Sequence, residues 1–378
     1  MAIAGVGESA SGVLPGVTAL QLHADAAAAA LADAGLALAD VDGLLTCGEG
    51  IDVLHVVRVA EYLGLRPTWF DSTFTGGSAW ETFVEHAALA IAAGHCETAL
   101  VVYGSTQRSD RGRRLGTETR GRAVGPRQFE VPFGANTVAE YALAARRHMH
   151  ELGTTPEQLA AVAVATRRHA ADNSAALYRE PISVDDVLAS RPIAEPLHLL
   201  DCCVVTDGGG ALVLTSLERA RSLRKEAIRI LGAGSALGSM TVSQAGDLTD
   251  IPARRAGELA YRRAGLRPAD VDVAQVYDSF TITVLLQLEA LGLCPRGEAG
   301  AWVEAGGMDV GGAVPTNTDG GGLSANHPGM RGVFLLVEAV RQLRGEAARQ
   351  VEGAEVALCS GTGGLLSSCA TVLLGVDR

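Results

Sequence analysis

One stretch of the sequence occurs twice, first as Ala34-Gly35-Leu36-Ala37-Leu38-Ala39-Asp40-Val41-Asp42 and again as Ala264-Gly265-Leu266-Arg267-Pro268-Ala269-Asp270-Val271-Asp272. Each copy closes a predicted helix and opens a predicted strand. Farther along each half, Glu97-Thr98-Ala99-Leu100 is echoed by Glu355-Val356-Ala357-Leu358, again before a strand that follows a buried helix. Self-similarity at this separation indicates two copies of one α/β unit, because a solenoid would repeat at a far shorter period.

The duplication predicts a pseudo-dimer of βαβ-rich halves, residues 1–220 and residues 221–378. The segment from about 105 to 206 interrupts the first half and is predicted to be an insertion over the core. Turns at equivalent strand ends should face each other across the pseudo-twofold axis, and ligands of open α/β sheets bind beyond the carboxyl ends of strands. One shared pocket is therefore expected between the turn at Gly76-Gly77 and the turn at Asn326-His327.

The second half contains the densest concentration of polar residues and glycines, directly ahead of a helical pattern. It reads Asn317-Thr318-Asp319-Gly320-Gly321-Gly322-Leu323-Ser324-Ala325-Asn326-His327-Pro328-Gly329-Met330-Arg331-Gly332. Backbone amides of a helix start and the imidazole of His327 would converge there, as an anion or a carbonyl oxygen requires. A histidine beside a Pro-Gly turn can also be a turn residue without a chemical role, so the site interpretation needs a second element.

That second element is Cys359-Ser360-Gly361-Thr362-Gly363-Gly364, which follows the apolar run Val356-Ala357-Leu358. The prediction is a strand that ends at Cys359, followed by glycines that let the backbone approach a ligand closely. A lone cysteine in an apolar run is often a small buried hydrophobe. Together, at the ends of neighbouring elements, the histidine and the cysteine favour a site.

Composition and charge exclude several classes of protein. With 48% hydrophobic and 20% charged residues in a chain of 378, the sequence is typical of a soluble, well-folded protein. A net charge of −12 argues against a nucleic-acid binder. Seven arginines nevertheless crowd one segment, either as a solvated loop or as a patch for a phosphorylated ligand or acidic partner: Arg108, Arg111, Arg113, Arg114, Arg120, Arg122 and Arg127.

The cysteines and the N-terminus bear on the compartment. Seven cysteines, an odd number without a CxxC pair, indicate free thiols in a reducing compartment and predict no metal site. The sequence lacks a signal-peptide pattern and an apolar run long enough to span a membrane. We therefore expect a cytoplasmic protein without membrane association.

Several motifs resemble those of a known family. Asn326-His327-Pro328 matches the Asn/Gly-His-Pro motif of thiolases, and Cys359-x-Gly361 matches their Cys-x-Gly motif. Val276-Tyr277-Asp278-Ser279-Phe280 stands in the place of Asn-Glu-Ala-Phe and resembles the Tyr-Asp-x-Phe of the related aldolases. Leu200-Asp201-Cys202-Cys203 and Thr206-Asp207-Gly208 resemble the same subgroup.

Over essentially its whole length, the chain resembles the thiolase superfamily. Within it, the resemblance is to the lipid-transfer-protein aldolases of steroid side-chain breakdown and to the sterol-carrier-protein-X thiolases. This implies a duplicated five-layer αβαβα fold, a homodimer, and an acyl-CoA substrate with no cofactor beyond its coenzyme A. It also implies a small zinc-ribbon and OB-fold partner protein that completes the site.

The sequence departs from thiolases at the residue that carries the acyl group. Thiolases place a nucleophilic cysteine at the start of the first buried helix, where this chain reads Phe74-Thr75-Gly76-Gly77-Ser78-Ala79-Trp80. Counting back from Gly94 places Gly77 at about the position of the missing cysteine. A ping-pong acyl-enzyme needs a thiolate or a comparable nucleophile, and nearby hydroxyls such as Ser78 are typical helix caps. The chain also has Asn326 where the aldolases are expected to have a second tyrosine, and those enzymes lack an equivalent of Cys359.

Proton transfer next to a thioester does not need the missing cysteine. His327 can donate to the thioester oxygen and stabilise an enolate, while Cys359 or Tyr277 exchanges a proton with carbon or with a β-hydroxyl. We therefore predict an acyl-CoA carbon–carbon lyase of the retro-aldol type, or a related Claisen-type enzyme. The predicted catalytic residues are His327, Cys359, Tyr277 and Asn326, and the predicted substrate-binding residues are Gly76, Gly77, Ser78, Asp278, Gly361 and Arg108.

Two other hypotheses remain open from the residues. The first is an acyltransferase that uses another nucleophile, and the second is a non-catalytic subunit that binds acyl-CoA or lipid. A covalent adduct would support the first, whereas ligand binding without an activity that depends on His327 would support the second.

Overall fold

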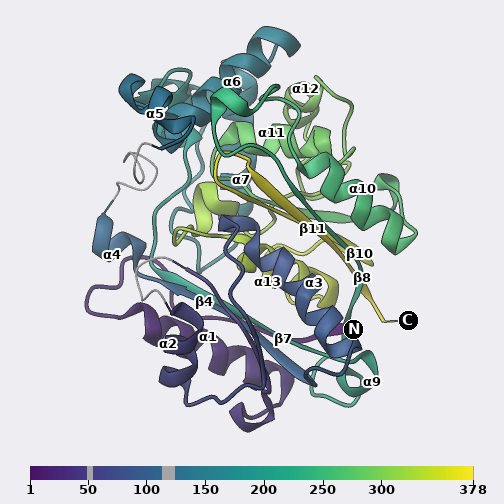
Figure 1. The fold of residues 1–378 in the computed structure, drawn as a ribbon. Coiled ribbons are helices and arrows are strands. Elements are labelled where there is room, and N and C mark those ends of the chain that lie inside the picture. Colours follow the sequence, from purple (N-terminus) through teal and green to yellow (C-terminus); the bar gives the residue numbers. More distant parts are fainter. Residues whose placement is uncertain (49–53, 113–123, 378) are drawn as a thin grey trace.

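A computed structural model describes residues 1–48, 54–112 and 124–377. Its centre is a nine-stranded mixed sheet in the order β3-β2-β4-β7-β1-β8-β11-β10-β9 (Figure 1). The strands are β1 (Ala2–Glu8), β2 (Gly43–Leu45), β3 (Trp69–Asp71), β4 (Thr98–Ser105), β7 (Gly208–Thr215), β8 (Ile228–Leu237), β9 (Val273–Val276), β10 (Val356–Gly363) and β11 (Ser368–Val376). A separate small ribbon pairs β5 (Pro192–Ala194) with β6 (Leu197–His198).

The sheet consists of two copies of one four-stranded pattern. In the first half the order is β2-β4-β7-β1, and in the second it is β9-β10-β11-β8. The first pair of each copy is parallel and the next two pairs are antiparallel. The copies meet where β1 and β8 pair through Ala2 and Ile3. The prediction of two pseudo-symmetric α/β halves is confirmed by this arrangement.

The repeated stretch makes the same hydrogen bonds in both halves. The carboxylate of Asp42 accepts from the amides of Glu97 and Thr98 at 2.8–3.0 Å. In the second copy, Asp272 accepts from the amides of Glu355 and Val356, both at 2.8 Å. Within each half, the first repeated stretch therefore contacts the second. The aspartate that ends the helix–strand connection accepts hydrogen bonds from the amides at the start of the neighbouring strand.

Helices complete five layers (Figure 1). α1 (Ala19–Ala34) packs on β1, β4 and β7, and α10 (Ala253–Ala264) packs on β8 and β11. Between the two half-sheets lie α3 (Ala79–Ala92) and α13 (Gly332–Arg344), which contact strands of both halves. The αβαβα architecture is thus as predicted. α2 (His55–Leu63) lies beside α1, and α9 (Leu217–Ala220) follows β7.

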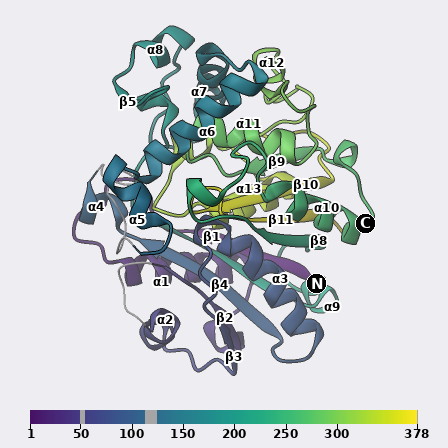
Figure 2. The ribbon, with the colours of Figure 1, turned by 45° about the horizontal axis from the view of Figure 1, so that its top comes forward.

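The insertion connects β4 to β7, which are otherwise antiparallel neighbours. It contains α4 (Gln107–Arg111), α5 (Arg127–Glu130), α6 (Thr137–Leu152), α7 (Pro156–Ala170) and α8 (Val184–Ala189). Figure 2 shows α6, α7 and α8 beside the second half, where α7 packs on α11 (Thr281–Ala290) and α12 (Ala299–Glu304). The equivalent connection in the second half, between β10 and β11, is a short turn, so the halves differ mainly here.

The structure corrects the predicted end of one strand. β10 does not stop at Cys359 but continues to Gly363, with Gly361 opposite Ala370 and Gly363 opposite Ser368 on β11. These glycines allow close packing rather than forming a loop. A Cβ added at Gly361 would lie 2.1 Å from Oε2 of Glu81, and one at Gly363 would lie 1.8 Å from the carbonyl oxygen of Thr75.

Glu81 is a buried carboxyl on the central helix α3. Its two oxygens have no hydrogen-bond partner among the described residues, and burial raises the pKa of Glu81 from 4.5 to about 8. The unfolded chain ionises this group above its ordinary pKa, whereas the folded chain keeps it protonated up to the raised pKa. Ionisation therefore favours unfolding between these two values.

We expect the wild-type protein to lose stability relative to Glu81→Gln as pH rises from about 4.5 to about 8. Above that interval the difference between the two free energies of unfolding should be constant, because both states of the wild type are then ionised. Urea unfolding at a series of pH values measures the difference. Glu258→Gln, at an exposed position on α10, is the control. A difference between wild type and Glu81→Gln that does not change with pH would contradict the expectation.

Membrane-spanning helices and clusters of metal ligands are both missing from the described residues. No helix among them combines the length and the apolar character needed to cross a bilayer. Within those same ranges, no three His, Cys, Asp or Glu side chains are grouped as metal ligands would be.

Candidate active site

A cavity opens where the carboxyl ends of β9 and β10 meet the turn before α3. We call it the dyad cavity, after the Tyr277–His327 pair in its wall. Both turns predicted to face each other, Gly76-Gly77 and the loop bearing His327, contribute to it. Its lining residues are Phe74, Gly76, Gly77, Tyr103, Ser105, Gln107, Thr137, Tyr141, Cys203, Tyr277, Ser279, Phe280, His327, Gly329, Met330, Thr362, Gly363 and Gly364.

Tyr277 and His327 form a hydrogen-bonded pair in this wall. Tyr277 follows β9 directly, and its amide donates to the carbonyl oxygen of Ser360 at 2.9 Å. Its hydroxyl lies 3.0 Å from Nε2 of His327 and accepts from the backbone amide of Arg331 at 3.2 Å. The amide of His327 donates to Oγ1 of Thr206 at 3.1 Å, so the insertion anchors the histidine loop. Two predicted catalytic residues, Tyr277 and His327, are therefore in contact. The bond to Ser360 fixes the backbone of the first, and the bond to Thr206 fixes the backbone of the second.

Both members of the pair are uncharged at neutral pH. Burial, followed by the charge of Arg331, lowers the pKa of His327 to about 3. Burial also raises the pKa of Tyr277 well above its usual range. Among the described residues, Nδ1 of His327 has no hydrogen-bond partner. A neutral phenol and a neutral imidazole in contact can pass a proton in either direction, as general acid–base chemistry requires.

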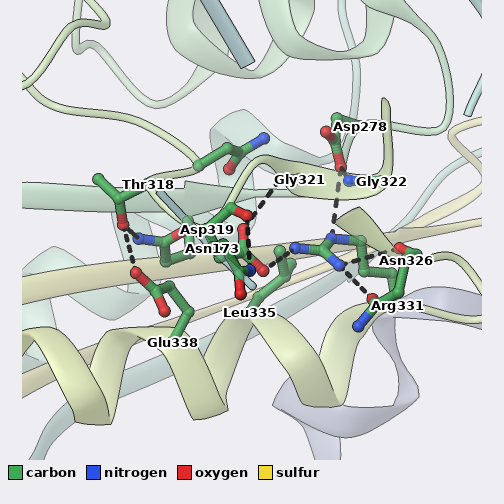
Figure 3. A network of polar contacts seen from close by, with 12 residues as sticks. Asn173, Asp278, Thr318, Asp319, Gly321, Gly322, Asn326, Arg331, Leu335 and Glu338 are labelled. Carbon is green, nitrogen blue, oxygen red and sulfur yellow. Dashed lines mark hydrogen bonds and ion pairs between the residues drawn. The ribbon is translucent and has the colours of Figure 1, made fainter. Parts of the chain in front are cut away.

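A buried ionic network holds the loop that carries His327 (Figure 3). The fully buried guanidinium of Arg331 pairs with Asp319 at 2.5 Å and donates to the carbonyl oxygen of Asn326 at 2.9 Å. Asp278, whose Oδ1 lies 3.6 Å from Nε of Arg331, accepts from the amides of Gly322 at 2.7 Å and Leu323 at 3.2 Å. The network therefore joins the residue after Tyr277 to both ends of the glycine-rich stretch.

The ring of Tyr277 occupies the space beside Gly77, the predicted position of the missing cysteine nucleophile. A Cβ added at Gly77 would lie 2.3 Å from Cε2 of Tyr277 and 2.5 Å from the carbonyl oxygen of Thr362. Real Cβ atoms do not approach other atoms this closely, so a side chain at position 77 would need the Tyr277 ring to move. At this position the glycine makes room for the ring of Tyr277 beside His327.

Cys359 does not meet His327 in the cavity, contrary to the prediction. Because β10 runs on past it, this residue sits inside the strand, is fully buried, and donates from Sγ to the carbonyl oxygen of Leu335 at 3.5 Å. Burial raises the pKa of its thiol well above the usual range. It is not among the described residues that line the cavity.

Other predicted site residues support the cavity without lining its described wall. The side chain of Asn326 bonds to Arg331, and Asp278 bonds to the backbone amides of the glycine-rich stretch. Oγ of Ser78 is hydrogen-bonded to Ser368 at 2.8 Å, and Gly361 packs on Glu81. Gly76 and Gly77 do line the cavity.

The arginine-rich segment is described in part. Arg108 lies on α4 and lines a neighbouring cavity rather than the dyad cavity. Arg127 pairs with the buried carboxylate of Glu140 at 3.5 Å. Arg113, Arg114, Arg120 and Arg122 lie outside the described residues.

Several lining side chains were not predicted to be site residues, and three of them are Cys203, Tyr141 and Thr362. Cys203 belongs to the Leu200–Cys203 stretch that resembles the aldolases, and its amide donates to the carbonyl oxygen of Ser279 at 2.9 Å. Tyr141 reaches from α6 of the insertion, where its hydroxyl donates to the carbonyl oxygen of Gly364 at 3.0 Å. Thr362 lies on the part of β10 that had been predicted to be a loop. In the sequence, Cys203 was signalled by the resemblance of its stretch and Thr362 by its place in the glycine-rich stretch after Cys359, whereas nothing signalled Tyr141.

Comparison with known proteins agrees with this fold. A family model described as "Thiolase C-terminal domain-like" matches residues 234–376. The chain is 41% identical to the "Steroid side-chain-cleaving aldolase" of Thermomonospora curvata, over 100% of this chain and 98% of that protein. It is 39% identical to the "17-hydroxy-3-oxo-4-pregnene-20-carboxyl-CoA lyase" of Mycobacterium tuberculosis, over 96% of each.

Solved structures show the same likeness. The "Ltp2-ChsH2(DUF35) aldolase" superposes with a TM-score of 0.90 at 38% identity, covering 100% of this chain and 98% of that one. Human mitochondrial 3-ketoacyl-CoA thiolase in complex with CoA superposes with a TM-score of 0.75 at 16% identity, covering 100% of this chain and 98% of that one. The second match shows the shared fold alone.

A duplicated αβαβα fold with a histidine loop and a Tyr-Asp turn at one cavity defines a thiolase-fold protein without a cysteine nucleophile. The chain belongs to the thiolase superfamily. Within that superfamily it belongs to the group that contains the steroid side-chain-cleaving aldolases.

Proposed function

We propose that this protein is an acyl-CoA carbon–carbon lyase that cleaves β-hydroxyacyl-CoA thioesters by a retro-aldol reaction. The observation that carries the proposal is the contact of 3.0 Å between the hydroxyl of Tyr277 and Nε2 of His327, at a cavity where Gly77 leaves no room for an acylated side chain. The names of the relatives, an aldolase and a CoA lyase, support the same reaction class.

The first step removes the proton of the β-hydroxyl. Because the hydroxyl of Tyr277 already accepts from the amide of Arg331, its own proton can point to Nε2 of His327. As the substrate hydroxyl gives its proton to the phenol oxygen, the phenol passes its proton to the imidazole. The Cα–Cβ bond then breaks, Cβ becomes a carbonyl carbon, and the electron pair forms the thioester enolate.

The second step returns the proton to Cα and restores the pair. The low pKa of His327 makes an isolated imidazolium unfavourable, so the imidazolium forms only together with the negative enolate. The imidazolium then gives its proton to Cα of the enolate. The products are a ketone or aldehyde and a shorter acyl-CoA, and no covalent intermediate is formed. The thiol of Cys203, in the same cavity, is a second group that can exchange a proton with Cα.

The acyltransferase alternative requires a nucleophile in the cavity. Position 77 cannot supply one without displacing the Tyr277 ring. The hydroxyl of Ser78 is engaged with Thr75 and Ser368, and Cys203 is a thiol whose pKa burial raises well above its usual range. The geometry therefore favours direct proton transfer over acylation.

We further propose that the active assembly contains two copies of this chain and a smaller partner with OB-fold and zinc-ribbon parts. The similar aldolase of known structure is named for two components, Ltp2 and ChsH2(DUF35), which supports a partner protein. Light scattering on protein isolated with a small tag from its own cells tests this. The expected mass exceeds that of two chains of 38.9 kDa each, and a mass equal to one chain would contradict the proposal.

The reaction is tested on the same preparation, which retains any bound partner. We expect 3-hydroxy-3-methylbutyryl-CoA or a bulkier tertiary β-hydroxyacyl-CoA to yield a ketone and a shorter acyl-CoA, as measured by mass spectrometry of the products. A β-ketoacyl-CoA with free CoA should not be thiolysed, and the intact protein should carry no acyl adduct. Thiolysis, an acyl adduct, or failure to cleave either hydroxy substrate would overturn the proposal.

A further inference from the structure

The enolate oxygen is the one reacting atom for which the proposed reaction has not yet named a protein partner. When the Cα–Cβ bond breaks, negative charge develops on the thioester oxygen, and a buried hydrogen-bond donor would stabilise it. In the proposed step, Tyr277 and His327 are engaged with the proton of the β-hydroxyl. The thioester carbon is only two bonds from Cβ, so a donor to its oxygen must line the same dyad cavity.

Five buried hydroxyl groups of the described residues line the dyad cavity. Four of them have hydrogen-bond partners, namely those of Tyr103, Tyr141, Tyr277 and Ser279. The fifth is the hydroxyl of Thr362, a residue that is 1% exposed. Within the described ranges, Oγ1 of Thr362 has no hydrogen-bond partner. Because buried polar groups are usually paired, this hydroxyl is a donor that a ligand in the cavity can use.

Thr362 lies beside the ring of Tyr277. Its carbonyl oxygen is 2.5 Å from the place that a Cβ at Gly77 would take, and Cε2 of Tyr277 is 2.3 Å from the same place. On β10, its neighbours Gly361 and Gly363 pack against α3 and the turn before that helix. Because side chains alternate along a strand, the side chain of Thr362 projects to the other face of the sheet. Thr362 therefore adjoins the reacting phenol through its backbone and reaches a further part of the wall with its hydroxyl.

Tyr141 of the insertion lies next to this hydroxyl. The phenol of Tyr141 donates to the carbonyl oxygen of Gly364, the first residue of the β10–β11 turn, at 3.0 Å. Its ring packs on Phe280 with the ring centres 4.6 Å apart. Burial raises the pKa of Tyr141 to about 12, although the nearby hydroxyls of Ser279 and Thr362 oppose the rise. Oγ1 of Thr362 is thus close to a neutral phenol but not in hydrogen-bond geometry with it, and its proton can point to a ligand.

We propose that Oγ1 of Thr362 donates a hydrogen bond to the thioester oxygen and that this bond strengthens as the enolate forms. Tyr141 is a positioning residue, because it holds the turn after Thr362 without touching the reacting atoms. Thr362 keeps its proton throughout. When His327 returns its proton to Cα, the thioester carbonyl is restored and the bond weakens. This inference rests on the proposed function, because it requires the enolate to form beside Tyr277.

The test removes the hydroxyl and keeps the shape of the side chain. Thr98→Val is the matched control for Thr362→Val, because Oγ1 of Thr98 on β4 is also buried without a partner among the described residues and lies outside the described wall of the cavity. Neither change breaks a protein hydrogen bond, so neither should lower the melting temperature. In Thr362→Val, kcat for cleavage should fall about 10²–10³-fold with little change in KM. Thr362→Ser should recover most of this loss, and Thr98→Val should keep full activity.

Binding of an enolate analogue tests the same contact without turnover. Calorimetry on the complex isolated from its own cells uses carboxymethyldethia-coenzyme A, whose carboxylate resembles the enolate, and free coenzyme A as the reference. Thr362→Val should bind the analogue about tenfold or more weakly, with no change for coenzyme A. Tyr141→Phe should show a smaller loss of the same selectivity and add nothing to Thr362→Val, because it acts through the threonine.

Unchanged affinity of Thr362→Val for the analogue, or a loss that Thr98→Val shares, would overturn the inference. A loss of equal size for free coenzyme A would also overturn it, because the contact would then not be to the enolate oxygen. Since binding of the analogue needs no cleavage, this failure is distinguishable from failure of the lyase reaction in the product assay.

Discussion

Replacing Tyr277 with phenylalanine is expected to lower kcat/KM for retro-aldol cleavage by about 10²–10⁴-fold, the range typical of a lost general acid–base group. The substitution removes one oxygen, and with it the contacts to Nε2 of His327 and to the amide of Arg331. The ring that fills the space beside Gly77 is kept. The loss should therefore fall on kcat, while KM and the melting temperature change little.

The control for this variant is another buried tyrosine that makes a backbone hydrogen bond away from the cavity. Tyr261 on α10 donates to the carbonyl oxygen of Leu291 at 3.2 Å. Tyr261→Phe should keep full activity, which separates chemistry from the general cost of a lost hydroxyl. His327→Gln should resemble Tyr277→Phe, and the double variant should be little worse than either single one, because the pair acts as a unit. Wild-type activity in Tyr277→Phe would remove the phenol from the mechanism.

Replacing Arg331 with methionine is expected to destabilise the fold by about 3–5 kcal/mol, the usual effect of removing one partner of a buried ion pair. Arg331 is completely buried, and its loss would leave Asp319 and Asp278 without their cation (Figure 3). The urea midpoint measures the change. The variant keeps the backbone amide at position 331. Its hydrogen bond to the hydroxyl of Tyr277 should therefore be lost only if the loop moves.

An exposed ion pair is the comparison for this variant. Arg254 pairs with Asp250 at 2.9 Å on the surface of the second half, and Arg254→Met should cost at most about 1 kcal/mol. Adding Asp319→Asn to Arg331→Met should restore part of the lost stability, because one unpaired charge is removed. Equal, small effects of Arg331→Met and Arg254→Met would show that the network does not hold the histidine loop.

The ring of Tyr277 connects the missing nucleophile with the proton-transfer pair. Thiolases and the present chain share the duplicated scaffold, but here a tyrosine ring packs against the glycine at the predicted place of the nucleophile. The same ring places its hydroxyl against the histidine. Loss of the nucleophile and gain of the phenol are therefore one steric change, since a side chain at position 77 and the ring of Tyr277 cannot occupy the same space.

The insertion adds a second level of difference between the halves. It anchors the histidine loop through Thr206 and contributes Cys203 and Tyr141 to the wall of the dyad cavity. The symmetric core thus supplies the Tyr277–His327 pair, whereas the asymmetric segment between β4 and β7 supplies further parts of the cavity wall.

The repeat at Ala34–Asp42 and Ala264–Asp272 was sufficient to predict the duplicated fold, because the hydrogen bonds that define each copy involve residues within the repeated stretches. His327 and Tyr277 were also identifiable, since each lies within a motif that resembles one of the family. The absence of a cysteine before α3 was visible in the sequence as well. These are features that neighbouring residues specify together.

Only the tertiary structure decided which of the candidate side chains meet. Cys359 lies within β10 because Gly361 and Gly363 continue the pairing with β11 beneath α3, a fact that depends on residues far away in the chain. Asn326 turns to Arg331, and Cys203 reaches the cavity from the insertion. A motif determines which chemical groups are present, but long-range packing determines which of them are buried against one another and which face the substrate.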